Sequence, residues 1–287
     1  MARIIVLGNG QLGTALAAVG GPDVAVLGRA ALDLTDVAAI EPRLAAIRPN
    51  LVINAAAYNK VDEAEQRPEL AFAVNAMAPG HIARACSAIG ARFIHVSTDY
   101  VFDGLLGRPY FEDDLPSPLG VYGTSKLAGE HLVQAYAGEH ACIVRTSAVF
   151  GVAGEGAGKG GNFVRAILRQ AAANQPLRVV ADQTTSPTYA PDLARAILAL
   201  AKTDASGLVH VTNGGSCTWH QFARAILELT GLDIPCLPIA SEPTPGRARR
   251  PSYSVLSGTR LGALGITMPP WRDALERYLR EIGARST

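Results

Sequence analysis

Short apolar runs alternate with segments of helical periodicity through the first 150 residues of this 287-residue chain. Strands that alternate with helices of this length form right-handed βαβ units, and the strands then lie parallel in one sheet. The runs are apolar throughout, as in Ile4-Ile5-Val6-Leu7, which is typical of strands covered on both faces. The pattern predicts an α/β fold with a doubly wound parallel sheet. The expected strands are Arg3–Leu7, Asp23–Leu27, Leu51–Asn54, Arg92–Ser97 and Ala141–Thr146, and the expected helices are Gln11–Ala18, Asp36–Ile47, Pro68–Ile89 and Tyr122–Ala137.

The character of the sequence changes after about residue 150. The Gly-rich stretch Gly151–Gly161 carries no periodicity and predicts a flexible loop, and prolines interrupt the elements that follow. We therefore expect a dinucleotide-binding domain over residues 1–150 and a smaller C-terminal, mainly substrate-binding lobe over 151–287, with some chain returning to the first domain. Helices are expected at Asn162–Ala173, Tyr189–Ala201, Trp219–Thr230 and Trp271–Ile282.

Charge and composition restrict the function classes. The net charge is only +1 and the basic residues are scattered except near Arg247–Arg250, which argues against a nucleic-acid partner. No leader-like N-terminal segment and no apolar run of membrane-spanning length is seen, so we expect a cytoplasmic protein without a membrane partner. The histidines and the cysteines (Cys86, Cys142, Cys217 and Cys236) show no metal-ligand spacing, so no metal is expected and the thiols are expected to be reduced.

A glycine motif follows the first expected strand directly and opens the first helix. In Gly8-Asn9-Gly10-Gln11-Leu12-Gly13, Gly8 suits a tight turn, Gly10 allows backbone to approach a pyrophosphate, and Gly13 permits close packing of helix on strand. The N-terminus of the helix attracts phosphate charge. A strand, this turn and a helix in succession predict a Rossmann-type dinucleotide site that includes Gln11 and Leu12.

The end of the second strand bears on the choice of cofactor. Arg29 stands where an acidic ribose ligand is usual, and an arginine there suits the 2′-phosphate of NADP(H). A solvated loop arginine would look the same in the sequence. Asp33, with Leu34 beside it, keeps NAD(H) open. Ala55-Ala56-Ala57 ends the third strand, where small side chains let a cofactor lie against the backbone.

Thr98, Tyr122 and Lys126 are the predicted reacting groups. Tyr122 and Lys126 lie four positions apart, so they share one face of a helix, although a surface helix can carry the same spacing. An ammonium beside a phenol favours the phenolate, so we expect a lowered pKa for Tyr122, a candidate general acid or base. Thr98 follows the fourth strand at its carboxyl end, where open α/β sheets bind ligands, and it suits a hydrogen bond to a substrate carbonyl. A turn that closes the strand is the alternative reading of Thr98.

These motifs resemble the extended short-chain dehydrogenase/reductase superfamily, and within it the dTDP-4-dehydrorhamnose reductases of bacterial rhamnose synthesis. The resemblance covers nearly the whole chain, and the blocks around Thr98 and Tyr122 are its most specific part. It rests on Gly10-Gln11-Leu12-Gly13, Leu32-Asp33-Leu34, Asn54-Ala55-Ala56-Ala57, Val61-Asp62, Val74-Asn75, Ser97-Thr98-Asp99-Tyr100-Val101-Phe102-Asp103-Gly104, Tyr122-Gly123-Thr124-Ser125-Lys126-Leu127-Ala128-Gly129-Glu130, Arg145-Thr146-Ser147, Gly161-Asn162-Phe163, Asp182-Gln183, Pro187-Thr188 and Arg250-Pro251.

The resemblance implies the reduction of dTDP-6-deoxy-L-lyxo-4-hexulose at C4 to dTDP-L-rhamnose by NADPH, with NADH also open. Tyr122 would donate a proton, Thr98 would polarise the carbonyl and Lys126 would bind the nicotinamide ribose. Asn75 would join the cofactor site, and the protein would be a monomer or homodimer. The implied substrate-side residues are Thr98, Asp99, Tyr100, Asn162, Gln183 and Arg250, with Arg249 beside the last; a solvated cluster is the alternative for the two arginines.

Three departures from the family pattern bear on these expectations. The glycine loop is one residue shorter than the family's Gly-x-x-Gly-x-x-Gly, which affects the pyrophosphate contacts. Ala148 stands where many relatives carry a tryptophan, which bears on sugar selectivity. Some relatives form metal-bridged dimers through a glutamate near the position of Pro191, and its absence argues against that assembly.

Three other functions share parts of the pattern. A 4,6-dehydratase carries Thr-Asp-Glu where this chain has Thr98-Asp99-Tyr100, so the carboxylate for elimination is missing. A 4-epimerase keeps an oxidised cofactor bound, which Arg29 fits less well. A non-catalytic regulatory subunit, like the relative that partners methionine adenosyltransferase, tolerates loss of the reacting groups, whereas here all three are intact.

Overall fold

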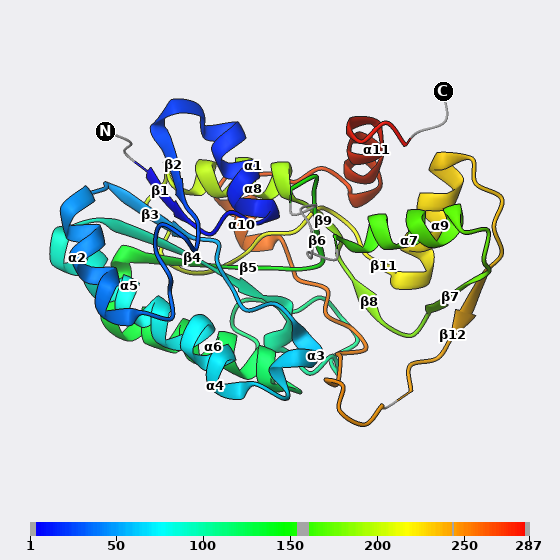
Figure 1. Ribbon diagram of the computed structural model, residues 1–287, viewed down its shortest axis with the longest axis horizontal. Helices are drawn as coiled ribbons and strands as arrows, with labels where there is room; N and C mark the ends of the chain where they lie inside the picture. Colours follow the sequence, from blue (N-terminus) through cyan, green and yellow to red (C-terminus); the bar gives the residue numbers. More distant parts are fainter. Residues whose placement is uncertain (1–3, 154–160, 243, 285–287) are drawn as a thin grey trace.

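A six-stranded parallel sheet forms the centre of the larger part of the molecule (Figure 1). The computed structural model describes residues 4–153, 161–242 and 244–284. The strand order is β10-β5-β4-β3-β1-β2, so the predicted doubly wound α/β fold is confirmed. The strands are β1 (Ile4–Leu7), β2 (Val24–Leu27), β3 (Leu51–Asn54), β4 (Arg92–Thr98), β5 (Ala141–Thr146) and β10 (Gly207–His210).

Helices cover both faces of this sheet, which is why its strands are apolar throughout. One face packs against α1 (Gln11–Gly20) and α8 (Ala190–Leu200), and the other against α2 (Val37–Ile47), α5 (Ala78–Ile89) and α6 (Val121–Ala137). Neighbouring strand residues point to opposite faces, so Val6 joins the first apolar cluster and Ile5 the second. Burying one such side chain stabilises the fold by about 1.5–3 kcal/mol.

The expected helix over Pro68–Ile89 is present without a break, but its middle turn is wider than an α-helical turn. The structure has α4 (Pro68–Phe72), a π-helical turn at Ala73–Met77 and then α5, after the short helix α3 (Val61–Ala64). Such wide turns are rare and often lie at functional sites. The turn carries Asn75, whose contacts with the cleft wall are described below.

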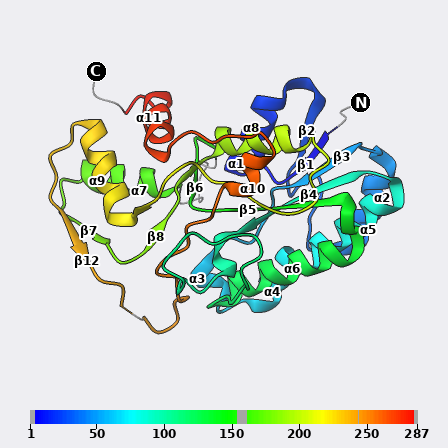
Figure 2. The same ribbon diagram turned by 180° about the vertical axis from the view of Figure 1, so that it is seen from behind.

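A small lobe is assembled from short strands that are far apart in the sequence. Figure 2 shows this lobe beside the sheet, with α9 and β12 at its outer edge. Its β7 (Leu177–Val180) pairs with β12 (Cys236–Ile239), and β8 (Thr184–Thr185) pairs with β11 (Cys217–Thr218). Its helices are α7 (Phe163–Ala172), α9 (Trp219–Thr230) and α11 (Trp271–Glu281). The predicted loop Gly151–Gly161 falls largely on residues 154–160, which lie outside the described residues.

Aromatic side chains form the core of the small lobe. Phe150 and Phe222 are buried, and Phe222 lies within ring-contact distance of Phe163, Trp219 and Trp271. Large rings bury much area per residue, which suits a lobe with few regular elements. α9 begins with a capping box, in which Thr218 and Gln221 bond each other's backbone N–H.

The chain returns from the small lobe to the sheet. After the pair β6 (Val149–Phe150) and β9 (Thr188–Tyr189), α8 packs on α1 and β10 becomes the edge strand beside β5. The short helix α10 (Thr259–Ala263) brings Leu261 into the same apolar cluster. We call residues 4–150 together with α8 and β10 the sheet half. In the part of the chain that the structure describes, no helix is long and apolar enough to cross a membrane.

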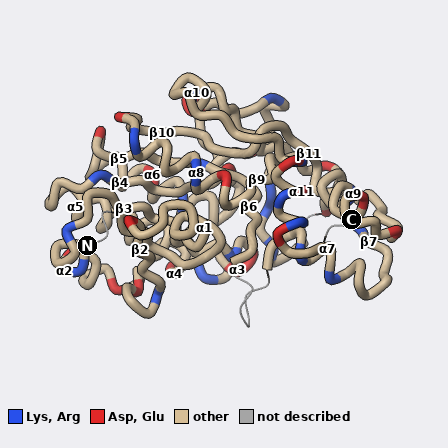
Figure 3. The backbone as a smooth tube through the Cα atoms, turned by 90° about the horizontal axis from the view of Figure 1, so that it is seen from above, with Lys and Arg blue, Asp and Glu red and all other residues tan. Residues whose placement is uncertain are grey.

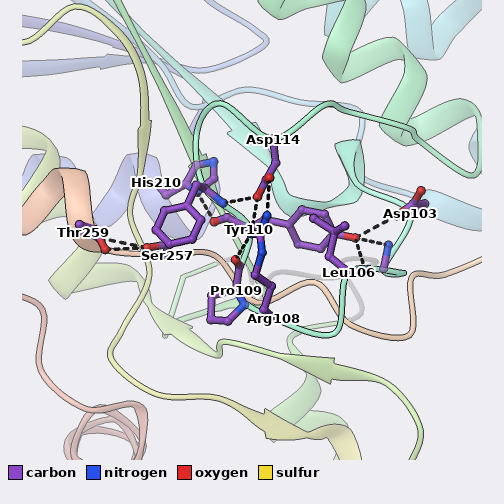
Figure 4. A network of polar contacts seen from close by, with 11 residues as sticks. Asp103, Leu106, Arg108, Pro109, Tyr110, Asp114, His210, Ser257 and Thr259 are labelled. Atoms are coloured by element: carbon purple, nitrogen blue, oxygen red, sulfur yellow. Dashed lines mark hydrogen bonds and ion pairs between the residues drawn. The ribbon is translucent and has the colours of Figure 1, made fainter.

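Tyr110 anchors the segment that leads from β4 to α6 (Figure 4). Its hydroxyl donates to Asp103 Oδ1 at 2.9 Å, and its carbonyl accepts from Ser257 N at 2.7 Å. The buried His210, at the end of β10, contacts the same carbonyl through Nδ1 at 3.1 Å. Arg108 and Asp114 close the turn with two contacts of 2.7 Å. The segment that precedes Tyr122 is thereby fixed to the sheet and to the C-terminal part of the chain.

Candidate active site

The glycine loop fits tightly between β1, α1 and β3. Gly8 has φ +100°, and a Cβ there would lie 2.8 Å from the backbone N of Ala56. A Cβ on Gly13 would lie 1.8 Å from the carbonyl oxygen of Gly8, so only glycine lets the helix approach the turn. Nothing lies within 4 Å of a Cβ built on Gly10, which caps the N-terminus of α1. The loop therefore leaves open space where the helix presents its free N–H groups.

A cleft of about 550 Å³ runs along the carboxyl ends of the strands. This is where open α/β sheets bind their ligands. Most of the predicted cofactor residues and two of the predicted substrate residues lie in its wall. The predicted residues that line the cleft are Gly8, Gly10, Gln11, Leu12, Arg29, Asp33, Leu34, Ala55, Ala56, Ala57, Thr98, Asp99, Tyr122 and Lys126.

Arg29 and Asp33 form an exposed ion pair at the β2 end of the cleft. Arg29 Nε lies 3.0 Å from Asp33 Oδ2, and the Arg29 side chain is 79% exposed. Asp33 also accepts hydrogen bonds from the backbone N–H and hydroxyl of Thr35, and these, with Arg29, lower the pKa of Asp33. The guanidinium is thus held at the cleft rim with most of its surface free.

The Tyr122 phenol lies in the cleft beside the hydroxyl of Thr98. Burial raises the pKa of Tyr122 to about 12, although a hydrogen bond with Thr98 acts in the opposite direction. The expected lowering of this pKa by Lys126 is therefore wrong for this structure. Lys126 directs its amino group toward β4, and the loss of water around the phenol has the larger effect.

Lys126 is buried below Tyr122 on the same face of α6. Its Nζ donates to the carbonyl of Val96 at 2.7 Å and lies 3.3 Å from Nε2 of His95. Burial lowers the pKa of Lys126 to about 8, and the charge of Glu130 acts in the opposite direction. The four-residue spacing correctly predicted that Lys126 and Tyr122 share one face of the helix. The contact of His95 with Lys126 was not predicted from the sequence.

A second buried group that sequence reasoning missed lies one helical turn further on. Glu130 and Arg145 form an ion pair with Nη2–Oε2 at 2.6 Å and Nε–Oε1 at 2.9 Å, and Ser97 donates to the same carboxylate. Both charged side chains are almost fully buried. The sequence carried a signal for Glu130, because Tyr122, Lys126 and Glu130 recur at four-residue intervals and so share a helix face.

Asp99 joins the end of β4 to the segments that enter the small lobe. It is buried, and its Oδ2 accepts from Ser147 Oγ at 2.7 Å and from Ser254 Oγ at 2.6 Å. Thr98 Oγ1 donates to Oδ1 at 3.1 Å. Burial raises the pKa of Asp99, with these hydrogen bonds acting against it. Asp99 therefore sets the position of the Thr98 hydroxyl in the cleft.

Tyr100 lines a second, smaller pocket next to Tyr122, and Arg250 contacts Tyr100 beside it. The Tyr100 ring meets Tyr122 edge to face with centroids 5.7 Å apart. Arg250 is hydrogen-bonded to Tyr100 and forms an ion pair with Asp62 at 3.0 Å. Arg249, the neighbour of Arg250, is exposed and lines this pocket with Tyr100 and Tyr122. The arginine segment is thus brought within reach of the reacting residues.

Asn75 supports the cleft wall from behind. Asn75 Oδ1 accepts from Tyr58 N at 2.8 Å, and its amide nitrogen donates to Tyr58 O and to Ser125 Oγ. Asn75 is fully buried, so its side chain ties the chain after Ala57 to α6. Cofactor contact by Asn75 stays a prediction.

Asn162 and Gln183, two predicted substrate residues, do not line the main cleft, although the Asn162 amide donates at 3.4 Å to Oε1 of Gln11, which does. The Asn162 amide donates to Gly151 O at 2.8 Å and Tyr278 OH at 3.0 Å, and its oxygen caps α7. Gln183 donates to Ser241 Oγ at 2.7 Å in the small lobe. Both side chains have structural partners here, and substrate contact by either stays a prediction.

Ala148 lines the cleft in an unusual backbone conformation. Its φ is +44°, which residues other than glycine rarely adopt. Its carbonyl accepts from Thr188 N at 3.2 Å, in the pairing of β6 with β9. The small side chain widens the cleft at the point where many members of the resembled family have a tryptophan.

The cleft fits a dinucleotide by its shape and its donors. The close approach of Gly8 to Ala56 and the open space at Gly10 leave room for a pyrophosphate at the start of α1. Ala55, Ala56 and Ala57 form a wall of small side chains. Among residues 4–153, 161–242 and 244–284, no three histidine, cysteine or acidic side chains gather as metal ligands do.

Known proteins of one family are similar to this chain over nearly its whole length. The family model described as the RmlD substrate binding domain matches residues 2–284. A dTDP-4-dehydrorhamnose reductase of Mycobacterium tuberculosis is 45% identical, over 96% of this chain and 92% of that protein. The spore coat polysaccharide biosynthesis protein SpsK of Bacillus subtilis is 38% identical, over 98% of both chains. The crystal structure of a dTDP-4-dehydrorhamnose reductase from Bacillus anthracis in complex with NADP superimposes with a TM-score of 0.91 at 37% identity, covering 98% of this chain and 99% of that one.

Proposed function

This chain belongs to the family of the RmlD substrate binding domain, and we propose that Thr98, Tyr122 and Lys126 carry out its reaction. That reaction is the reduction of dTDP-4-dehydro-6-deoxy-L-mannose to dTDP-L-rhamnose with NAD(P)H. The observation that carries the proposal is the position of the three side chains in one wall of the cleft that the glycine loop also lines.

NADPH, when bound, supplies the hydride that reduces C4 of the sugar. Tyr122, whose raised pKa keeps the phenol protonated near neutral pH, donates its proton to the oxygen on C4. When substrate is bound, the Thr98 hydroxyl turns its single hydrogen from Asp99 Oδ1 to that same oxygen. Lys126 would hold the ribose next to the nicotinamide. Arg29 would bind the 2′-phosphate, and Gly8–Leu12 would hold the pyrophosphate.

We assign residues 1–150 to the cofactor and 151–287 mainly to the substrate. The Arg249 and Arg250 region faces the nucleotide diphosphate of the substrate, which the pocket beside Tyr100 and Tyr122 supports. Ala148 leaves room for the sugar. The protein acts in the cytoplasm as a monomer or homodimer and without nucleic acid. Four free cysteines and the intermixed basic and acidic residues seen along the chain in Figure 3 support this setting.

A dehydratase function is disfavoured by the residues around Thr98. Elimination needs an acid–base pair beside the threonine, but Asp99 is buried among serine hydroxyls and Tyr100 follows it. Mixing the protein with dTDP-glucose and oxidised cofactor is therefore expected to leave the sugar unchanged. Formation of a 4-keto-6-deoxy sugar would contradict the assignment.

The direct test supplies the 4-keto sugar. The protein is incubated with NADPH and dTDP-4-keto-6-deoxyglucose, with and without a 3,5-epimerase, while absorbance and the sugar product are followed. We expect NADPH oxidation and dTDP-L-rhamnose only when the epimerase is present. Equal turnover without the epimerase would indicate a different 4-ketoreductase, and no turnover in either case would contradict the proposal.

A further inference from the structure

The short helix α3 lies where two segments from distant parts of the chain meet. Asp62 in α3 and Glu65 directly after it are three positions apart in continuous helical backbone, so their side chains lie on one face. Asp62 contacts the arginine segment, by which we mean residues 247–250, and Glu65 contacts the start of α6, which carries Tyr122. Figure 1 shows the chain after β12 returning past α3. Two carboxylates on one short element thus hold both segments.

Glu65 caps α6 from outside the helix. Gly120 occupies the N-cap position and has no side chain to accept from the free N–H groups there. Glu65 Oε1 accepts from Val121 N at 2.8 Å instead. A Cβ on Gly120 would lie 2.5 Å from this oxygen, so a side chain there would displace the carboxylate. Because a negative charge also favours a helix N-terminus, Glu65 fixes the turn in which Tyr122 is the second residue.

Asp62 holds the arginine segment through its backbone and through a side chain. Oδ1 accepts from Ala248 N at 3.1 Å, and the two carboxylate oxygens accept from Arg250 Nη2 at 3.0 and 3.1 Å. Arg250 Nη1 donates to the Ala248 carbonyl at 3.1 Å. The Arg250 side chain nevertheless stays 31% exposed. Asp62 therefore fixes the direction of the guanidinium and leaves part of it open to a ligand.

The small pocket beside Tyr122 lies between these two anchors, and Glu65 and Arg249 line it. Tyr100 joins its two sides. A Cβ on Gly123 would lie 2.2 Å from the Tyr100 carbonyl oxygen, so α6 packs directly on the Tyr100 backbone, and the Tyr100 side chain is hydrogen-bonded to Arg250. A shift of either anchored segment would therefore change the distance between Tyr122 and the arginines.

We propose that Asp62 and Glu65 are positioning residues for the substrate. Asp62 sets the arginine segment for the nucleotide diphosphate, and Glu65 sets Tyr122 for the oxygen on C4. The inference rests on the proposed function, in which one substrate contacts both segments. The two carboxylates then act on different steps, because the arginine segment takes part in binding and Tyr122 in the reaction that follows. Loss of Asp62 should raise KM, and loss of Glu65 should lower kcat.

Asp62→Asn tests the binding side. The amide oxygen can still accept from Ala248 N, but the charge is lost and an NH2 group can face the Arg250 guanidinium. We expect KM for the 4-keto sugar nucleotide to rise about fivefold, with kcat near that of the parent protein. Glu69→Gln, which removes an exposed carboxylate of α4, is the control and should change neither constant.

Glu65→Ala tests the reacting side. The variant leaves Val121 N without its acceptor, so Tyr122 loses its fixed position and kcat should fall about tenfold or more at a similar KM. Glu65→Gln keeps an oxygen that accepts from Val121 N and should restore most of kcat. An equal loss of kcat in both Glu65 variants would overturn the proposal. The same would follow if Asp62→Asn and Glu65→Ala changed the same constant.

Hydrogen exchange of single amides, measured by NMR without substrate or cofactor, tests the anchors independently of turnover. Asp62→Ala should remove protection at Ala248 only, and Glu65→Ala at Val121 only, while NADPH affinity stays near that of the parent protein. Unchanged exchange at either amide in its variant would overturn the proposal even if the protein reduces the sugar. If the parent protein does not reduce the sugar, the proposed function fails, and the exchange data still decide whether the two anchors exist.

Discussion

The sheet half and the small lobe bury their residues in different ways. The sheet half places aliphatic side chains on both faces of one sheet and gathers polar ones, among them Lys126, Glu130 and Arg145, at the strand ends. The small lobe has one cluster rich in aromatic rings and pairs strands that are about 33 and about 59 residues apart in the sequence. The sheet half therefore presents the proposed reacting groups from a rigid frame, whereas the small lobe depends on a few large side chains.

The largest effect is expected from Tyr122→Phe, which tests whether the sheet half holds the chemistry. The change keeps the ring and removes the proton donor, so kcat for the 4-keto sugar should fall by about 10²–10⁴-fold. Cofactor affinity, measured by fluorescence titration, should barely change because Lys126 and the glycine loop remain. Tyr136→Phe, on the exposed face of the same helix, is the control. Near-parent turnover by Tyr122→Phe would rule out this mechanism.

Phe222→Ala tests whether the small lobe depends on single rings. Loss of a buried phenylalanine ring costs about 3–5 kcal/mol of unfolding free energy. Hydrogen exchange should show lost protection in β7 and β12 while β3 and β4 keep theirs. Phe93→Ala, in β4, is expected to show the reverse pattern, and Phe111→Ala, partly exposed, should change little. Equal loss of protection everywhere in the Phe222 variant would show that the two regions unfold as one.

Glu130→Gln tests the buried polar frame of the sheet half. The variant leaves the charge of Arg145 buried without its partner, which should cost about 3 kcal/mol of unfolding free energy in denaturant titration. Glu228→Gln breaks a surface ion pair with Arg272 in the small lobe and should have little effect. Similar losses of unfolding free energy in the two variants would show that the buried ion pair matters no more to stability than the exposed one.

Arg29→Ala gives the smallest expected effect and sharpens the assignment of the cofactor side. Loss of a charge-assisted contact with a 2′-phosphate should weaken NADPH by roughly 1.5–3 kcal/mol, about a tenfold or greater rise in Kd. NADH should bind about as before, and Arg43→Ala, an exposed arginine of α2, should affect neither cofactor. An equal effect of Arg29→Ala on both cofactors would show that Arg29 does not recognise the phosphate.

The sheet half was largely predictable from the sequence because its information is local. The expected strands and the cleft-lining runs at Gly8 and Ala55 follow from patterns of a few residues, and the spacing of Tyr122 and Lys126 follows from the helical repeat. Other contacts depend on distant partners. The pairing of β7 with β12 and the contact of His95 with Lys126 join residues that no local pattern links. The π-helical turn at Asn75 was missed because it satisfies a tertiary contact with Tyr58.

The return of the chain from the small lobe to the sheet has a consequence for protein synthesis. The edge strand β10 and the helix α8 come from residues 190–210, after much of the small lobe. When the ribosome has released the first 150 residues, α1 is present, but the apolar surface that α8 covers is still bare and β5 still has an open edge. The sheet half therefore cannot complete its fold before α8 and β10 have been synthesised. Chains that end within the small lobe would expose the unpaired edge of β5, which can pair with strands of other molecules. Such chains would need chaperones to prevent aggregation.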